Sequence, residues 1–258
     1  MNLRIENLKF SYPSIRVLKD ICMELHSGTL VSIVGRNGAG KSTLLKCMNR
    51  ILQSYKGTIL LDEQSIELMK NKEIAQRIAY LPQAGEHVFP VTVYDMVLMG
   101  RYPHMTWSMK EYDKSYVWRI LEIMGLQELA IRDFRYISGG QQQQVLIARA
   151  LAQQADVFLL DEPTNNLDIR HQLKVMEIIK KLAQKNNILT VISIHDLNLA
   201  ARYADRVIMI NQGRIHAAGK PNEVFTEENI QQVYGVYAKT IKTDNKVHII
   251  PVRSMDLI

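Results

Sequence analysis

The sequence of 258 residues lacks the features that mark secreted or membrane-spanning chains. Its two cysteines, Cys22 and Cys47, provide no disulfide framework, which suits a reducing cytoplasm. No apolar run approaches the roughly 18 residues that a membrane-spanning helix needs. Residues 1–6 alternate like a strand and lack the apolar block of a signal peptide. These absences predict a soluble chain in the cytoplasm.

Concentrated charge and metal-ligand clusters are also lacking. Lys and Arg exceed Asp and Glu by 32 to 26, a net charge of +6, but no dense basic tract occurs. We interpret the excess as a modest attraction to nucleotides and lipid headgroups, not as a nucleic-acid surface. Six of the seven histidines form no ligand cluster, and we interpret them as structural or solvated: His26, His87, His104, His171, His216 and His248.

A phosphate loop is the first motif that is present. Residues 35–43 match G-x-x-x-x-G-K-[ST] and lie between the apolar run 30–34 and the helical stretch 44–48, the strand–loop–helix order that this motif requires. Backbone N–H groups of such a loop and the following helix N-terminus bind phosphate. Lys41 is expected to reach the β- and γ-phosphates and Ser42 to bind Mg²⁺. The alternative is a glycine-rich turn that caps a helix by chance. The loop comprises Gly35, Arg36, Asn37, Gly38, Ala39, Gly40, Lys41, Ser42 and Thr43.

Two adjacent carboxylates follow a second apolar run, residues 157–160, which is typical of a strand buried in a parallel sheet. Carboxylates at the end of a buried strand are costly unless a cation lies beside them. Asp161 is therefore a candidate Mg²⁺ partner, and Glu162 is a candidate for polarising the water that attacks the γ-phosphate. The alternative is an exposed Asp-Glu-Pro turn.

Two further motifs point to phosphate. The tetrapeptide Ser138, Gly139, Gly140 and Gln141 precedes a helix predicted over 141–153, so its N–H groups favour an anion. An ordinary helix cap is the alternative. His195 follows the apolar run 188–194, which places it at the same sheet edge as Asp161, where it can hydrogen-bond the γ-phosphate.

These motifs, in this order, resemble the nucleotide-binding subunits of ABC transporters over nearly the whole chain. The resemblance implies ATP and Mg²⁺ as cofactors. It identifies Tyr12 as the aromatic that stacks on adenine, with a packed strand tyrosine as the alternative, and Gln83 as a contact to Mg²⁺ and to the membrane partner. It identifies Asn166-Leu167-Asp168 as the D-loop. It also implies a head-to-tail homodimer, in which Ser138 of one copy covers the γ-phosphate held by Lys41 of the other.

A few positions depart from the family pattern. Ile137 replaces leucine, Gln144 replaces arginine, and Asn165-Asn166 replaces Ser-Ala. We expect Gln144 to affect only a contact on the helix surface.

The predicted fold is α/β, a P-loop NTPase with a RecA-like core, an antiparallel β portion and an inserted helical lobe. One ABC ATPase domain is expected over 1–258: core in 1–84 and 156–218, helical lobe in 85–155, and C-terminal appendage in 219–258. The tail contains two short helical patterns and a strand at 247–251.

Four segments resemble one branch of the family, the importers of ferric siderophores, haem or cobalamin. They are residues 93–104, 162–168, 195–200 and 223–225. The resemblance implies a peripheral subunit on the cytoplasmic face of the inner membrane, which powers import through two copies of a permease supplied by an extracytoplasmic binding protein. Segment 93–104, with Arg101, Tyr102 and His104 expected to be exposed, suits permease docking; a solvated loop is the alternative.

Other P-loop classes fit less well. A GTPase or small-molecule kinase uses no Ser-Gly-Gly-Gln, and the base-reading Asn-Lys-x-Asp is missing. A DNA-repair or chromosome ATPase needs a long coiled coil between the phosphate loop and the tetrapeptide at 138–141, which is the signature of the ABC family. A non-transport ABC ATPase with a regulatory or translation-associated role stays open as the alternative.

Overall fold

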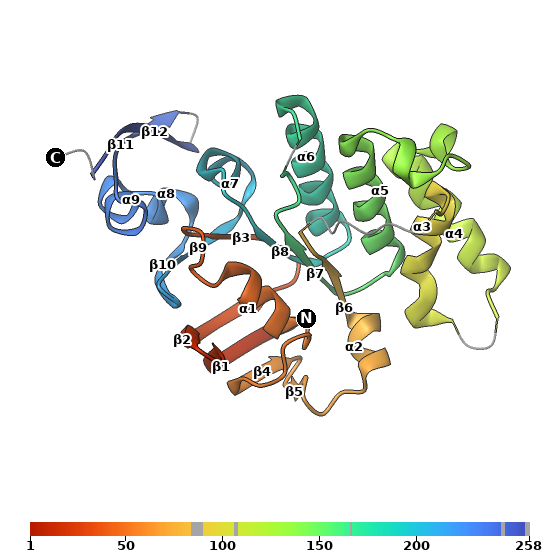
Figure 1. The fold of residues 1–258 in the computed structure, drawn as a ribbon, viewed down its shortest axis with the longest axis horizontal. Helices are drawn as coiled ribbons and strands as arrows, with labels where there is room; N and C mark the ends of the chain where they lie inside the picture. Colours follow the sequence, from red (N-terminus) through yellow and green to blue (C-terminus); the bar gives the residue numbers. More distant parts are fainter. Residues whose placement is uncertain (84–89, 106–107, 166, 244–245, 256–258) are drawn as a thin grey trace.

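The computed structural model describes residues 1–83, 90–105, 108–165, 167–243 and 246–255. Figure 1 shows a core of strands and helices, a group of helices on one side of it (yellow and green), and a C-terminal hairpin at the opposite end (blue). Within the described residues, none of the helices combines the length and apolar character that crossing a bilayer requires.

The central sheet has the strand order β10-β9-β3-β8-β7-β6. Neighbouring strands are parallel except β10, which is antiparallel to β9. Every residue of β3, β7 and β8 is buried, as the apolar runs predict. The strands are β3 (Leu30–Val34), β6 (Ile78–Leu81), β7 (Val157–Asp161), β8 (Leu189–Ser193), β9 (Arg206–Asn211) and β10 (Arg214–Gly219).

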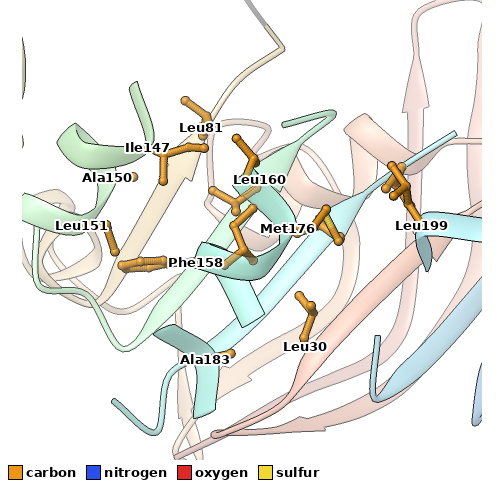
Figure 2. Close-up of a cluster of buried hydrophobic side chains, with 14 of the residues drawn as sticks. Leu30, Leu81, Ile147, Ala150, Leu151, Phe158, Leu160, Met176, Ala183 and Leu199 are labelled. Atoms are coloured by element: carbon orange, nitrogen blue, oxygen red, sulfur yellow. The ribbon is translucent and has the colours of Figure 1, made fainter. Parts of the chain in front are cut away.

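Alternate residues of the central strands enter two hydrophobic cores, one on each face of the sheet. Val157 and Leu159 of β7 join a core that also contains α1 (Lys41–Met48) and the antiparallel sheet. Phe158 and Leu160 join the other core, with side chains of α5 (Gly139–Ala152) and α6 (Ile169–Lys185). Figure 2 shows this second core, where Phe158 lies beside Leu151 of α5. The helices around the signature are therefore tied directly to the strand that ends in Asp161.

The antiparallel sheet has the order β2-β1-β4-β5. Leu3 and Ile5 of the inner strand β1 are buried in the core while Arg4 between them is less buried, which is the alternation of a strand with one covered face. Its strands are β1 (Asn2–Tyr12), β2 (Ile15–His26), β4 (Lys56–Leu61) and β5 (Gln64–Ser65). The predicted P-loop core with an antiparallel β portion is confirmed.

Helices α3, α4 and α5 pack on one another beside the core. The lobe contains α3 (Val93–Leu98), α4 (Glu111–Met124) and α5 (Gly139–Ala152), with 3₁₀ turns at Met99–His104, Gln127–Leu129 and Phe134–Tyr136. Helix α5 starts two residues before the predicted helix because Ser138 caps it. Further helices are α2 (Asn71–Arg77), α6 (Ile169–Lys185) and α7 (Leu197–Tyr203).

The prediction that Arg101 is exposed is wrong. Its side chain is 3% exposed, and its Nε donates to Asp113 Oδ1 at 2.9 Å. Its Nη1 donates to the carbonyl of Ala152 at 2.8 Å, and the guanidinium lies 5.1 Å from the ring centre of Tyr116. Burial is possible because these groups satisfy both the charge and the N–H donors. Tyr102 is exposed as expected, whereas His104 is half-buried, with its Nε2 2.6 Å from the carbonyl oxygen of Gln153.

The C-terminal residues form α8 (Pro221–Val224), α9 (Glu227–Tyr234) and the hairpin of β11 (Val236–Thr243) with β12 (Lys246–Ser254). The predicted short helices and the strand at 247–251 are confirmed. Asn198 on α7 bonds both backbone groups of Ile249, with its Oδ1 accepting from the N–H at 2.8 Å and its Nδ2 donating to the carbonyl at 3.1 Å. The hairpin is thereby fastened to the helix that follows His195.

Candidate phosphate-binding and catalytic site

The phosphate loop connects β3 to α1 and requires its glycines. Gly35 has φ +151°, and a Cβ at this residue would lie 2.3 Å from the carbonyl oxygen of Ile210, so any side chain would collide with the neighbouring strand. Gly40, the residue before α1, has φ +106°, which L residues with side chains rarely adopt. The glycines therefore let the chain turn from the end of β3 into α1, as a phosphate-binding loop requires.

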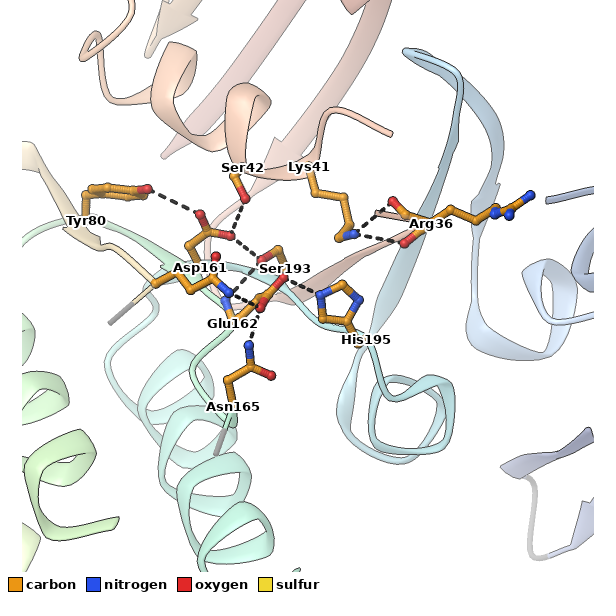
Figure 3. A network of polar contacts seen from close by, with 11 residues as sticks. Arg36, Lys41, Ser42, Tyr80, Asp161, Glu162, Asn165, Ser193 and His195 are labelled. Atoms are coloured by element: carbon orange, nitrogen blue, oxygen red, sulfur yellow. Dashed lines mark hydrogen bonds and ion pairs between the residues drawn. The ribbon is translucent and has the colours of Figure 1, made fainter. Parts of the chain in front are cut away.

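Lys41 lies inside this loop. Its Nζ donates to the carbonyl oxygens of Gly35 at 2.8 Å and Arg36 at 3.2 Å (Figure 3). Burial lowers the pKa of Lys41, although the carboxylates of Glu162 and Asp161 oppose this by raising it. The ammonium is therefore placed where it gains from a further anionic partner, which a triphosphate would supply.

Asp161, the last residue of β7, faces the start of α1. Its Oδ1 accepts hydrogen bonds from Ser42 Oγ at 2.9 Å and from Ser193 Oγ at 2.5 Å, and its Oδ2 accepts from the Tyr80 hydroxyl at 3.4 Å. Hydroxyl and carboxylate oxygens side by side are the hard ligands that Mg²⁺ prefers. These residues therefore fit a magnesium ion, as the sequence predicts for Ser42 and Asp161.

Glu162 has a left-handed backbone conformation, with φ +52°. Its Oε2 accepts from Gln83 Nε2 at 2.7 Å and from the amide of Asn165, and its Oε1 contacts His195 Nε2. Figure 3 shows the carboxylate between Asn165 and the imidazole. Only 9% of Glu162 is exposed, yet its carboxylate oxygens lie among polar side chains. A carboxylate that receives a proton from water needs such surroundings.

Lys41, Ser42 and Glu162 border one open cavity of about 570 Å³. Tyr12, 41% exposed, lines it and contacts Phe10 edge-to-face with ring centres 5.0 Å apart. The described lining residues are Tyr12, Val17, Asn37, Gly38, Gly40, Lys41, Ser42, Thr43, Gln83, Glu162, Asn165 and His195. The cavity thus joins the phosphate loop, the Glu162 carboxylate and His195, while Ala39 of the loop is buried in the hydrophobic core.

The signature, residues 138–141, does not line the loop cavity. Ser138 caps α5 in a capping box: its Oγ accepts from the N–H of Gln141 at 3.3 Å, and its own N–H donates to Gln141 Oε1 at 3.0 Å. Neither Ser138 to Gln141 nor Asp168 is among the described residues that line the loop cavity. Asp168 is the N-cap of α6, and the predicted D-loop residue Asn166 lies outside the described residues. One chain therefore does not bring the signature to its own phosphate loop.

The structure differs from the sequence-based expectation at Gln144 and adds Ser193 to the site. Gln144 is buried rather than on the helix surface, and its Nε2 has no hydrogen-bond partner within the described chain. It lies on the face of α5 that packs into the protein, because helical spacing places it beside Ile147 and Ala148. Ser193 was not predicted as a site residue. Its one sequence signal is a hydroxyl at the end of a mostly apolar strand.

A phosphate loop, a strand ending in two carboxylates and a helical lobe with a second capped helix define an ATPase cassette. A model of the ABC transporter family matches residues 18–165, and the chain belongs to this family. The resemblance inferred from the motifs is therefore confirmed: the chain is an ATP-binding cassette and an ATPase.

Three curated relatives match most of the chain. An uncharacterized ABC transporter ATP-binding protein of Methanocaldococcus jannaschii is 46% identical over 92% of this chain and 93% of its own. The petrobactin import ATP-binding protein FpuD of Bacillus anthracis is 40% identical over 94% and 89%. The iron(3+)-hydroxamate import ATP-binding protein of Bacillus subtilis is 35% identical over 100% and 96%.

Two solved structures share the fold. An inward-facing ABC transporter assigned to the metal-chelate type is 29% identical, covers 97% of both chains and has a TM-score of 0.84. A dimeric cassette in a post-hydrolysis state, bound to ADP and phosphate, is 26% identical over 85% of this chain and 98% of its own, with a TM-score of 0.75.

Proposed function

We propose that this chain powers the import of a metal chelate, such as a ferric siderophore, haem or cobalamin, through a membrane permease. The gathering of Lys41, Glu162 and His195 around one cavity carries the ATPase part of this proposal. The relatives named as petrobactin and iron(3+)-hydroxamate import proteins, and the transporter of the metal-chelate type, support the choice of cargo.

In the proposed reaction, Glu162 accepts a proton from water as the water oxygen bonds to the γ-phosphorus, and the bridging oxygen leaves with ADP. Gln83, Asn165 and His195 hold the carboxylate for this step, since all three contact it. Ser42 and Asp161 would hold Mg²⁺, assisted by Gln83. When bound, the ion neutralises charge on the β- and γ-phosphates.

The cycle requires two copies. Helix α5 presents the capped N-terminus at Ser138 outside the loop cavity, so a second phosphate contact is available to another molecule. We propose that two copies close head to tail, with Ser138 of one copy over the γ-phosphate held by Lys41 of the other. The dimeric cassette bound to ADP and phosphate supports this arrangement.

The permease would dock on the helical lobe, near Gln83 and segment 93–104. A cavity of about 440 Å³ opens beside this segment, and its lining includes Leu98, Tyr102 and Ile131. Tyr102 and Ile131 are largely exposed. Asp95 and Asp133 also line it, so apolar and acidic groups lie side by side. A mixed surface of this kind, open to solvent, suits a short segment of a membrane partner. The subunit would then lie on the cytoplasmic face of the membrane.

Uptake assays test the proposal. A strain without this chain would be supplied with labelled ferric siderophore, haem or cobalamin, and complemented with the wild type or with Glu162→Gln. Uptake of one chelate should return only with the wild type. If none of these substrates depends on the chain while its ATPase is active, import of a metal chelate is wrong, and a regulatory ATPase without transport becomes the better account.

A further inference from the structure

His171 lies at the third position of α6, between two loops that face the second copy in the proposed dimer. Its Nδ1 is 2.8 Å from both carboxylate oxygens of Asp168. Separately, its backbone N–H donates to Asp168 Oδ1 at 2.8 Å, which is the N-cap bond of the helix. The imidazole therefore adds a bond to Asp168 that the cap itself does not need.

The same ring packs against the signature. A Cβ at Gly140 would lie 3.1 Å from Cδ2 and 3.2 Å from Cγ of His171, which is tighter than most real Cβ contacts. Gly140 belongs to helix α5 and has no left-handed φ, so its backbone alone does not require glycine. The neighbouring imidazole favours glycine, because a side chain would fit only if the ring moved by a few tenths of an ångström.

His171 thus connects two helix starts that are far apart in the sequence. Ser138 caps α5 and Asp168 caps α6, while the ring lies against Gly140 on one side and Asp168 on the other. If the ring is removed, a void opens between the two helix starts, and each can shift by itself. A helix N-terminus acts on an anion only at close range, so even a small shift matters.

We propose that His171 is a positioning residue, which holds the signature loop and Asp168 of one chain in a fixed relation so that both meet the nucleotide of the second copy together. This inference rests on the proposed head-to-tail dimer. His171 has no role in binding the nucleotide of its own chain, because it is not among the described residues that line the loop cavity.

The test variant is His171→Ala. The cap bond of α6 survives because the backbone N–H supplies it, and alanine favours a helix more than histidine does. We expect turnover at saturating ATP to fall by roughly tenfold, while binding of a fluorescent ATP analogue to the single chain and the thermal midpoint stay as in the wild type. His171→Gln, which keeps bulk and an N–H donor, should recover most of the loss. Lys174→Ala, an exposed change one turn further along α6, is the matched control.

A double-mutant cycle tests the contact itself. Gly140→Ala alone must push the ring aside, but with His171→Ala the added methyl group finds room. Gly140→Ala should therefore reduce turnover less in the His171→Ala background than in the wild type. Equal reductions in both backgrounds would mean that the two residues act independently, and would overturn the inference.

Dimer formation separates failure of the inference from failure of the proposed function. In a Glu162→Gln background with ATP and Mg²⁺, light scattering should show a dimer, and adding His171→Ala should shift it toward monomer. If the parent stays monomeric, the proposed dimer is wrong. If the parent dimerises and His171→Ala has normal turnover and dimerisation, or loses nucleotide binding and thermal stability together, only the role of His171 is wrong.

Discussion

The backbone N–H of Glu162 donates a hydrogen bond to the side-chain Oγ of Ser193 at 3.0 Å. The same hydroxyl donates to Asp161 Oδ1 at 2.5 Å. One side chain of β8 thus fixes both acidic residues at the end of β7. Because Glu162 turns there into the left-handed conformation, its carboxylate points to Gln83, Asn165 and His195.

The first prediction concerns this carboxylate. Glu162→Gln keeps the shape of the side chain but removes the proton acceptor. ATP binding should stay within about twofold, while turnover falls by at least about 10²-fold, the lower end of the contribution of a general base. Phosphate release and equilibrium nucleotide binding check this. Equal turnover in mutant and parent would contradict the assignment of Glu162 as the base.

Ser193→Ala should affect stability as well as turnover. The change leaves the buried N–H of Glu162 with its longer contact to the Ser193 carbonyl at 3.2 Å and removes a donor from Asp161. We expect a loss of about 1 to 3 kcal/mol in the free energy of unfolding, as for a buried polar group that loses its partner. Denaturant unfolding measures this loss. Thr190→Ala is the control, since this buried hydroxyl of the same strand has no hydrogen-bond partner in the described structure.

Lys41→Ala should lose nucleotide affinity rather than turnover alone. Among the described residues that line the loop cavity, Lys41 is the one Lys or Arg side chain. Hydrogen bonds to charged groups contribute about 1.5 to 3 kcal/mol each, so the dissociation constant for ATP should rise by at least about tenfold. Calorimetric titration with ATP and Mg²⁺ gives the constant. Unchanged affinity would show that Lys41 does not contact the phosphates.

Local patterns in the sequence predicted the strands, the phosphate loop and most of the site residues. Buried parallel strands are continuous apolar runs, so the ends of β3, β7 and β8 could be located, and with them Lys41, Asp161 and His195. The contacts of Ser193 with the acidic residues could not be predicted, since they depend on which strands are neighbours. The burial of Arg101 could not be predicted either. Its partner Asp113 lies on α4, and the sequence around Arg101 does not indicate that α4 packs against it.

The link between Asn198 and Ile249 leads to a local prediction. Asn198→Ala removes both hydrogen bonds that fasten the hairpin to α7, a loss of about 1 to 3 kcal/mol. Backbone amides of 246–254 should exchange faster with deuterium, while those of the buried strand β3 keep their protection. Peptide-resolved hydrogen exchange checks this. Equal acceleration in β3 would mean that the variant loosens the whole core instead.

The buried ion pair of Arg101 with Asp113 gives the pH prediction. Burial raises the pKa of Asp113, but hydrogen bonds from Arg101 and the Lys110 N–H outweigh this and leave the pKa below its usual value. A carboxyl with a lowered folded-state pKa stabilises the protein above its unfolded pKa of about 3.9, and this contribution is lost as the pH falls through the folded value.

Asp113→Asn leaves the Arg101 charge buried without its counter-ion and should cost about 3 kcal/mol near pH 7. Unfolding measured from pH 7 to 3 should show wild type and variant converging below pH about 4. A gap that stays constant over this range would mean that the charge of Asp113 contributes nothing and that the loss comes from packing.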